Sequence, residues 1–257
     1  MNDSTALAGK HALITGGGHG IGGASAEALA AHGTKLTLTG RNMEKLEQMA
    51  ASLPDAEVRQ LDVTDEDAVK RVFAGAAESL GPVNILVNNA GIADTAPFLR
   101  TSSDMMRHLI EVNLIGTHTC TQQVLPAMID TGWGRVVNIS SLAGLSGQPY
   151  IAAYCASKHA VIGLTRTLAL EIVKKGITAN AVCPAYVETG MVDRGVENIQ
   201  SITGMSVEKA RAELAKKSPQ DRIIQPSEVG ATVAWLCLPG SESITGQSIA
   251  MAGGAWM

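Results

Sequence analysis

The chain has few aromatic residues, few charges and no block of a single charge sign. Aromatic side chains make up 3% and charged side chains 17% of its 257 residues. The 20 lysines and arginines stand against 24 aspartates and glutamates, for a formal net charge of -4. Because such a chain has no global basic field to hold a polyphosphate, we expect no nucleic-acid partner. Hydrophobic residues reach 46%, which is enough for one substantial core and argues against disorder.

Cysteine is scarce, and the four cysteines lie far apart. Cys120, Cys155, Cys183 and Cys237 form no C-x-x-C pair and have no histidine at ligand spacing. This pattern excludes a zinc site and a disulfide framework. We therefore expect no metal, and four small buried side chains.

Long hydrophobic runs are missing as well. No stretch approaches the roughly 18 apolar residues of a membrane span. The amino terminus carries Asp3 where a secretory signal would carry positive charge. We expect a cytoplasmic protein with no membrane partner.

Glycine, by contrast, is abundant at 27 residues, and short apolar runs alternate with longer segments of helical period. This alternation is the signature of successive β-α units that build a parallel sheet. The expected strands cover residues 11–15, 35–39, 57–61, 83–88, 135–140, 178–183 and 248–250. No linker divides the sequence, so we expect one α/β domain over residues 1–257, with about seven parallel strands and helices on both faces.

Local signals place several helix ends. Thr64, followed by three acidic residues, is typical of an amino-terminal cap, and Pro226 opens a further helix. Gly33 and Gly176 follow periodic segments as carboxyl-terminal caps. Residues 189–218 interrupt the alternation, and their apolar residues recur at near-helical spacing. We expect this segment to be a helical flap over a site.

A glycine-rich turn joins the first expected strand to the first helix. The sequence from Thr15 reads T-G-G-G-H-G-I-G-G, and the informative spacing is that of Gly16, Gly20 and Gly22. Without Cβ atoms the backbone can approach a pyrophosphate, and the helix start presents free N–H groups to it. The alternative is a turn that is rich in glycine for packing alone. The residues expected to bind a dinucleotide here are Gly16, Gly18, His19, Gly20, Ile21 and Gly22.

The end of the second expected strand bears on the choice between the two nicotinamide dinucleotides. An acidic residue there would accept a hydrogen bond from the ribose 2′-hydroxyl of NAD, whereas an arginine would favour binding of the 2′-phosphate of NADP. The strand is followed by Gly40, Arg41 and Asn42, with no carboxylate. Arg41 can pair with phosphate, so we predict NADP(H) over NAD(H). The alternative is that Arg41 stacks on adenine or faces solvent, which leaves NAD(H) possible.

Tyr154 and Lys158 are four residues apart on an expected helix. Their side chains therefore emerge on one face. An ammonium beside the phenol favours the phenolate, so we predict that the pKa of Tyr154 falls toward neutrality and that the phenol works as an acid or base. Thirteen residues upstream, Ser141 ends the fifth strand at the ligand-binding edge of the sheet. A Y-x-x-x-K pair alone is more often a surface tyrosine beside a solvated lysine. Only the combination with Ser141, the glycine turn and Arg41 favours a catalytic site.

Together these motifs resemble the classical short-chain dehydrogenase/reductase family, over nearly the entire chain. The resemblance extends to L-D-V at 61–63, N-N-A-G at 88–91, E-V-N-L-I-G at 111–116 and N-A-V-C-P at 180–184. It implies a Rossmann-type fold and a catalytic tetrad of Asn113, Ser141, Tyr154 and Lys158. In that family the tyrosine donates a proton to the carbonyl, the serine polarises it, the lysine holds the ribose and the asparagine anchors a water. The resemblance also implies cofactor contacts from Asp62, Val63, Asn89, Ala90, Gly91, Tyr154, Lys158, Val187 and Thr189.

One departure concerns the residue after Pro184, where the family usually has glycine and this chain has Ala185. The added methyl group could narrow the nicotinamide end or alter backbone angles that only glycine adopts freely.

The walls of the expected site are largely apolar, which indicates a hydrophobic ketone or secondary alcohol. The expected substrate contacts are Ser141, Leu142, Gln148, Tyr154, Tyr186 and Met191. Among subfamilies the chain most resembles 3-oxoacyl-thioester reductases and aromatic-polyketide ketoreductases. Three alternatives stay open: an NADP(H)-binding regulator without turnover, an NAD(H)-dependent alcohol dehydrogenase of the same family, and an epimerase or dehydratase. Family members are mostly tetramers, and we expect a homo-oligomer, on the resemblance and on an apolar carboxyl-terminal tail.

Overall fold

A computed structural model describes residues 5–256. Its centre is a sheet of seven parallel strands in the order β3-β2-β1-β4-β5-β6-β7. The strands are β1 His11–Thr15, β2 Lys35–Gly40, β3 Ala56–Gln60, β4 Val83–Asn88, β5 Gly134–Ile139, β6 Ile177–Pro184 and β7 Ser248–Met251. The predicted strands are confirmed, with ends that differ by at most one residue.

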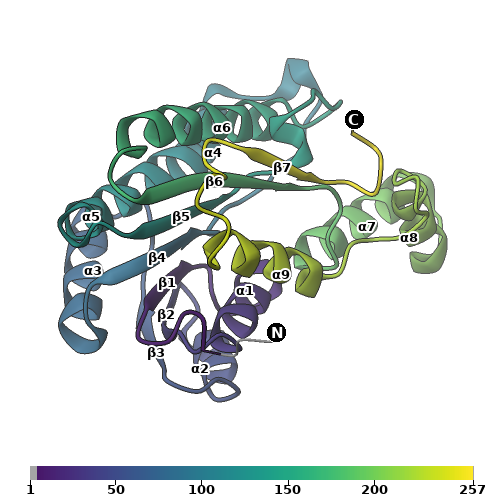
Figure 1. Cartoon of the computed structure of the whole chain (residues 1–257). Helices are drawn as coiled ribbons and strands as arrows, with labels where there is room; N and C mark the ends of the chain where they lie inside the picture. The colour runs from purple at the N-terminus through teal and green to yellow at the C-terminus, as the bar shows by residue number, and fades with distance from the viewer. Residues whose placement is uncertain (1–4, 257) are drawn as a thin grey trace.

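Helices cover both faces of the sheet (Figure 1). They are α1 Gly20–Ala30, α2 Met43–Ala50, α3 Glu66–Leu80, α4 Ser103–Ile110, α5 Gly116–Thr131, α6 Ala152–Ile172, α7 Gly190–Thr203, α8 Val207–Ala215 and α9 Pro226–Cys237. A π-helical segment, Glu111–Ile115, joins α4 to α5. Helices α1, α2 and α9 lie on one face and α3 to α6 on the other. The expected Rossmann-type arrangement is confirmed.

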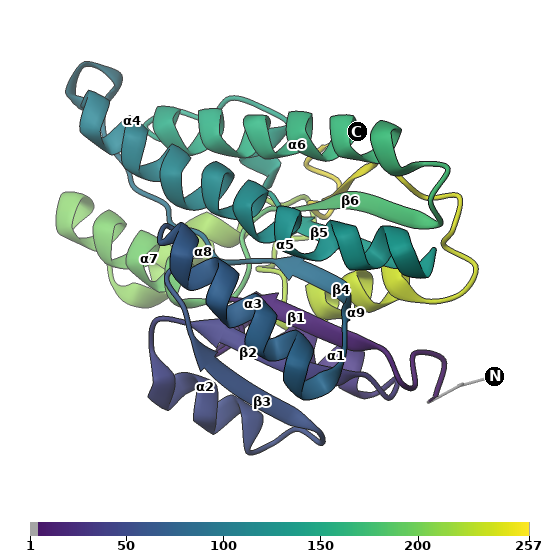
Figure 2. The same cartoon turned by 90° about the vertical axis from the view of Figure 1, so that its left-hand side faces the viewer.

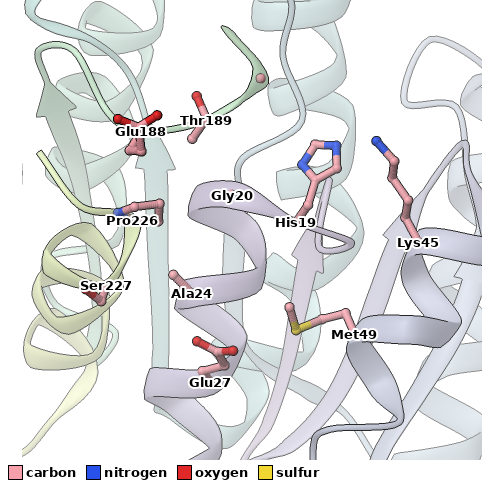
Figure 3. A pocket seen from close by; sticks show the side chains of 11 residues that line it. His19, Gly20, Ala24, Glu27, Lys45, Met49, Glu188, Thr189, Pro226 and Ser227 are labelled. Atoms are coloured by element: carbon pink, nitrogen blue, oxygen red, sulfur yellow. The ribbon is translucent and has the colours of Figure 1, made fainter. Parts of the chain in front are cut away.

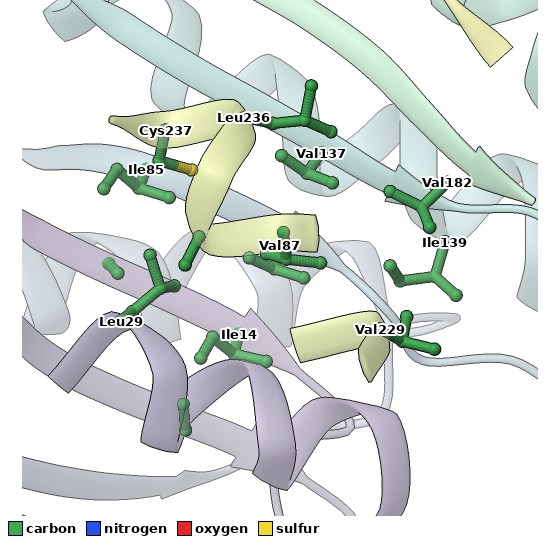
Figure 4. Close-up of a cluster of buried hydrophobic side chains, with 14 of the residues drawn as sticks. Ile14, Leu29, Ile85, Val87, Val137, Ile139, Val182, Val229, Leu236 and Cys237 are labelled. Carbon is green, nitrogen blue, oxygen red and sulfur yellow. The ribbon is translucent and has the colours of Figure 1, made fainter. Parts of the chain in front are cut away.

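Two hydrophobic clusters, one on each face, fix the sheet between these layers. Figure 4 shows part of the larger cluster, in which Ile14 and Val87 from the central strands pack beside Leu29 of α1 and Val229 of α9. The central strands are buried along their whole length, as expected for a parallel sheet with helices on both faces. Gly230 lets α9 pack closely on α1, because a Cβ there would collide with the Ala24 carbonyl oxygen of α1.

The strand order reverses between β1 and β4, whose connections run to opposite sides. In open α/β sheets such a switch point leaves a crevice at the carboxyl ends of the strands, where ligands bind. Figure 2 shows α7 and α8 projecting beyond this edge of the sheet. The predicted helical character of residues 189–218 is confirmed by these two helices.

The helix caps agree with the sequence except at one end. Gly33 and Gly176 have φ of 82° and 73°, the left-handed values that suit glycine. Pro226 opens α9 as predicted. The cap of α3 is Asp65 rather than Thr64, because the Asp65 carboxylate accepts the Ala68 N–H at 2.9 Å. Thr64 instead donates its hydroxyl to Asp62 at 2.8 Å.

Candidate active site

The glycine turn is shaped by backbone angles and close contacts that exclude side chains. Gly16 and Gly20 have φ of 65° and 58°, in the left-handed region that L side chains rarely adopt. A Cβ on Gly22 would lie 2.2 Å from the Gly16 carbonyl oxygen. The three glycines of the predicted pattern therefore form one tight turn, and the start of α1 beyond it can offer N–H groups to an anion.

Asn89, which directly follows β4, and Thr15, the last residue of β1, hold this turn in place by hydrogen bonds. The Asn89 side-chain amide donates to the carbonyls of Thr15 and Gly16, both at 3.0 Å. The Thr15 hydroxyl accepts the backbone N–H groups of Asn89 and Ala90, both at 3.0 Å. The side chain of Asn89, which the sequence assigned to cofactor contact, thus holds the turn in place. Thr15 was missed as a site residue, although its place just before the first glycine could have indicated it.

A cavity of about 440 Å³ opens beside the turn. His19 and Lys45 lie on one side of it and Glu188 and Thr189 on the other, with Gly20 at the helix start between them (Figure 3). Its lining comprises His19, Gly20, Ala24, Glu27, Lys45, Met49, Glu188, Thr189, Gly190, Pro226 and Ser227. Because the turn has no Cβ atoms facing a pyrophosphate and the helix start points to this edge, the residues present fit a dinucleotide. Sequence reasoning missed Lys45 and Glu188, since no motif marks them.

A second hollow of about 360 Å³ lies beyond the end of β2 and is lined by Arg41, Gln60, Leu61, Asp62 and Ala68. Burial would raise the pKa of Asp62, but the hydrogen bonds from Thr64 and the charge of Arg41 outweigh it and lower the pKa. Arg41 is exposed and its backbone carbonyl accepts the Gln60 side-chain amide at 3.1 Å. Arg41 and Asp62, two residues predicted separately to bind the cofactor, therefore line the same hollow.

Tyr154 and Lys158 lie on the first turns of α6, as predicted, but their electrostatics differ from the prediction. The ammonium nitrogen of Lys158 is 5.8 Å from the Tyr154 ring centroid and donates to the Ile139 carbonyl at 2.8 Å. Burial raises the pKa of Tyr154, and the hydrogen bond from Ser141 offsets this only in part. The predicted fall of the Tyr154 pKa is wrong, because desolvation of the phenolate outweighs the lowering effect of Ser141. Burial also lowers the pKa of Lys158 to about 8.

Ser141 follows β5 at the carboxyl edge of the sheet, as predicted. Its hydroxyl oxygen accepts the Ala143 N–H at 3.1 Å, which leaves the hydroxyl proton available. The same hydroxyl lies near enough to the Tyr154 phenol to lower its pKa. The structure thus joins a helix residue and a strand-end residue that are thirteen positions apart.

Asn113 is buried in the π-helical segment, and its side chain is held on every polar atom. The amide accepts the Ile92 N–H at 2.9 Å and donates to the Ile92 carbonyl and to Ser157 Oγ, each at 2.9 Å. Ser157 in turn donates to the Tyr154 carbonyl at 2.8 Å. Sequence reasoning missed Ser157, although its place directly before Lys158 could have indicated it. Through Ser157, Asn113 is linked to the backbone of Tyr154.

Gly91 lies against this network. A Cβ there would be 3.1 Å from Asn113 Oδ1 and 3.5 Å from Lys158 Nζ. The predicted residue of the N-N-A-G motif is therefore in contact with two members of the expected tetrad.

Several predicted cofactor residues turn their side chains away from the cavity. Val187 is buried in the main hydrophobic cluster, and Ile21 packs against that cluster. Val63 is buried against Gly116, whose Cβ would lie 2.7 Å from Val63 Cγ2. For Val63 and Val187 only the backbone is available to a ligand, whereas the side chain of Ile21 is half-buried. Ala185 does not have a left-handed φ, so the structure accepts the alanine that replaces the family's usual glycine.

The predicted substrate residues occupy different environments. Tyr186 packs in a small cluster with α7 and α8, and its hydroxyl lies 3.2 Å from Lys217 Nζ. Met191 is exposed, Gln148 is half-buried and Leu142 is buried. Tyr186 is therefore engaged with the flap.

Among residues 5–256, no group of histidine, cysteine and acidic side chains could hold a metal ion, and no helix is long and apolar enough to cross a bilayer. The four cysteines are buried and free, as expected.

Comparisons with known proteins agree on one family. The profile of the short chain dehydrogenase family matches residues 10–200. A Streptomyces coelicolor protein named as a ketoacyl reductase is 38% identical over 249 residues, covering 95% of each chain. A 3-oxoacyl-(acyl-carrier-protein) reductase of Thermotoga maritima is 36% identical over 252 residues, covering 96% of this chain and 98% of that protein. A crystal structure of an actinorhodin polyketide ketoreductase variant with NADPH has a TM-score of 0.93 and 36% identity, and the match covers 98% of both chains.

Proposed function

The chain belongs to the short-chain dehydrogenase family, and from this we propose that it is an NADP(H)-dependent reductase of hydrophobic ketones, of the polyketide or 3-oxoacyl type. The observation that carries the proposal is the group formed by Ser141, Tyr154 and Lys158 at the same sheet edge as the glycine turn. A non-catalytic binding protein would not need a phenol and a serine hydroxyl joined in this way.

Tyr154 acts as the proton donor. Because burial raises the pKa of its phenol, the hydroxyl keeps its proton at neutral pH and can deliver it to a carbonyl oxygen. Ser141 donates a second hydrogen bond to the same oxygen, since its own oxygen already accepts the Ala143 N–H. NADPH, when bound, supplies the hydride to the carbonyl carbon.

Lys158 and Asn113 assist Tyr154 in its role as proton donor. The ammonium of Lys158 places a positive charge one helical turn from the phenol and can hold the ribose hydroxyls of the cofactor. Asn113 orders the segment beside Lys158 and contributes to the proton relay. The tetrad is thus Asn113, Ser141, Tyr154 and Lys158.

The turn that begins at Gly16 would hold the cofactor. The turn and the start of α1 would bind the pyrophosphate, and the hollow that Asp62 and Arg41 line would hold the adenosine. Arg41 would bind the 2′-phosphate, because β2 ends without a carboxylate. The further backbone contacts are those of Gly18, His19, Gly20, Ile21, Gly22, Val63, Asn89, Ala90, Gly91, Val187 and Thr189. The NADPH in the related ketoreductase structure supports this assignment.

The substrate contacts Leu142, Gln148, Tyr186 and Met191 in addition to Ser141 and Tyr154. The apolar side chains among them favour a ketone with a hydrophobic body. The relatives named as ketoacyl and 3-oxoacyl reductases support a thioester or polyketide ketone.

Initial rates with NADPH and with NADH, on a thioester and on a cyclic or aryl ketone, test the proposal. We expect NADPH to be oxidised faster than NADH, with acetoacetyl-CoA or with a cyclic or aryl ketone such as 1-tetralone. Inactivity on thioesters but not on aryl ketones would remove the acyl assignment. Binding of NADPH without turnover of any ketone would favour a regulator instead, and product formed without net oxidation would favour an epimerase or dehydratase.

The proposal extends to organisation, location and assembly. The chain forms one catalytic domain and acts in the cytoplasm. It assembles into a homo-oligomer, which we expect to be a tetramer. Exposed apolar side chains on α6 and α9 support self-association, among them Leu170 at 78% and Trp235 at 46% exposure. Sedimentation should give a mass above 26.7 kDa, and a single species of that mass would contradict it.

A further inference from the structure

The flap, residues 189–218, is connected to the rest of the domain through a narrow neck, which consists of residues 186–188 before it and Ile224 after it. An isolated parallel bridge pairs Val187 with Ile224. The Glu188 N–H donates to the Ile224 carbonyl and the Ile224 N–H donates to the Tyr186 carbonyl, each at 2.9 Å. The segment that leads into the flap and the segment that leads out of it are thus hydrogen-bonded to one another. Helices α7 and α8 extend from this neck.

The flap has its own small hydrophobic cluster. Val192 and Val196 of α7 pack with Ala210 and Leu214 of α8, and this cluster is separate from the two that hold the sheet. Helices α7 and α8 pack chiefly on one another. A unit with its own core, attached through a neck, can change its angle to the sheet without losing its internal packing.

Arg211 is the side chain that ties this unit to the neck. From α8 its guanidinium donates to Glu188 in the neck, through Nη1 at 2.8 Å and through Nη2, and Nη2 also reaches Asp193 of α7 at 3.0 Å. One side chain therefore connects α8, α7 and the neck. Lys217 adds a weaker contact to the Tyr186 hydroxyl at 3.2 Å.

The neck residue that Arg211 holds is also a wall of the cofactor cavity. Glu188 and Thr189 line the cavity on the side opposite His19 (Figure 3), and Gly190 is also part of its lining. The methyl carbon of Thr189 lies 3.1 Å from where a Cβ of Gly20 would be, so the wall touches the glycine turn. A carboxylate in this wall would repel a pyrophosphate unless a cation paired with it.

We propose that Arg211 is a positioning residue, which holds the flap against the neck and neutralises Glu188 where the cofactor and the ketone enter. The assignment rests on the proposed function for its catalytic consequences, whereas its structural consequences stand apart from turnover. Loss of Arg211 then loosens the flap, weakens NADPH binding and raises the ketone KM, while the proton donor and its neighbours stay in place.

The test compares Arg211→Met with Lys216→Met. Lys216, at the carboxyl-terminal end of α8, pairs at 2.7 Å with Glu213 of that helix and contacts no neck residue. Its variant therefore loses one charge and one ion pair from α8 but no contact with the neck. In Arg211→Met we expect faster hydrogen exchange over residues 190–217 and roughly 5-fold rises in the NADPH Kd and the ketone KM, the size expected for part-exposed ion pairs. The kcat should stay within about 2-fold, since the proton-donating groups do not touch Arg211.

Two further variants keep the result decisive. Arg211→Lys retains the charge without the two-pronged contact, so it should give intermediate exchange and affinity. Glu188→Gln combined with Arg211→Met should be less than additive, because both changes remove one contact. The proposal would be overturned if Arg211→Met had the same hydrogen exchange rates over residues 190–217 and the same NADPH affinity as Lys216→Met. Because these two measurements need no turnover, they decide the matter even if no ketone is reduced.

Discussion

Lys158 approaches Tyr154 from the next turn of the same helix, yet its ammonium donates a hydrogen bond to the Ile139 carbonyl rather than to the phenol. The phenol keeps a raised pKa, because its burial outweighs the lowering effect of Ser141. The pair is therefore suited to donating a proton to a ketone. It would need a further stabilisation of the phenolate to accept one from an alcohol.

Tyr154→Phe should remove this proton. We expect kcat/KM for ketone reduction to fall by about 10²- to 10⁴-fold, the usual contribution of a positioned general acid. NADPH binding, measured by fluorescence titration, should change little, since the ring remains. Undiminished reduction by the variant would contradict the assignment of Tyr154.

The charge state of Lys158 predicts a pH dependence of activity. Burial lowers its pKa to about 8, so the ammonium is present below that pH and is lost as the pH rises through it. The kcat/KM for NADPH, which reports the free protein, should therefore fall above about pH 8. In Lys158→Arg this fall should disappear from the range up to pH 10, because a guanidinium stays charged. A wild-type profile that is flat from pH 7 to 10 would speak against it.

Ser157→Ala should weaken the support of Asn113. The change leaves the buried Asn113 amide with one N–H unpaired and frees the Tyr154 carbonyl, so the free energy of unfolding should drop by about 1–3 kcal/mol. Urea unfolding measures the drop, with the exposed Ser201→Ala as the control. Equal stability of the two variants would show that the Asn113 link is dispensable.

Arg41→Ala should chiefly affect NADPH. A charge-assisted hydrogen bond contributes about 1.5–3 kcal/mol, so we expect the KM for NADPH to rise about 10-fold or more while that for NADH changes little. Arg107→Ala, on α4 away from both hollows, serves as the control. A parallel rise in both KM values would place Arg41 on the adenine instead.

The burial of His11 leads us to predict that the folded protein loses stability at acidic pH. Burial lowers its pKa below the ordinary 6.5, against the opposing effects of the Gly81 carbonyl and the Glu57 charge. The folded protein therefore favours the neutral ring. Its contribution to stability is complete above pH 6.5 and is lost as the pH falls through the lowered pKa.

Urea unfolding at several pH values between 8 and 5 tests this. His11→Gln cannot titrate, so its stability should fall less over that range than that of the wild type. The exposed His159→Gln should follow the wild type. Wild-type and His11→Gln curves that run parallel would exclude His11 as the source.

Much of the site could be read from the chain because its signals are local. The glycine turn, the pair Tyr154 and Lys158, and the position of Ser141 at a strand end all depend on short spacings and on the period of one helix or strand. Lys45 and Glu188 could not be read in this way. They come to the cavity from α2 and from the neck, and no spacing links them to the turn.

Local patterns in the chain are enough to predict the succession of strands and helices, the glycine turn and the residues that meet at the sheet edge, since apolar periodicity and glycine placement act within a few residues. The direction of the Tyr154 pKa, the hydrogen bonds of Asn89 to the turn and the contact of Arg211 with Glu188 are properties of the folded chain. These depend on burial and on side chains distant in sequence. Desolvation is set by everything packed around a group, so no local pattern in the chain can encode its outcome.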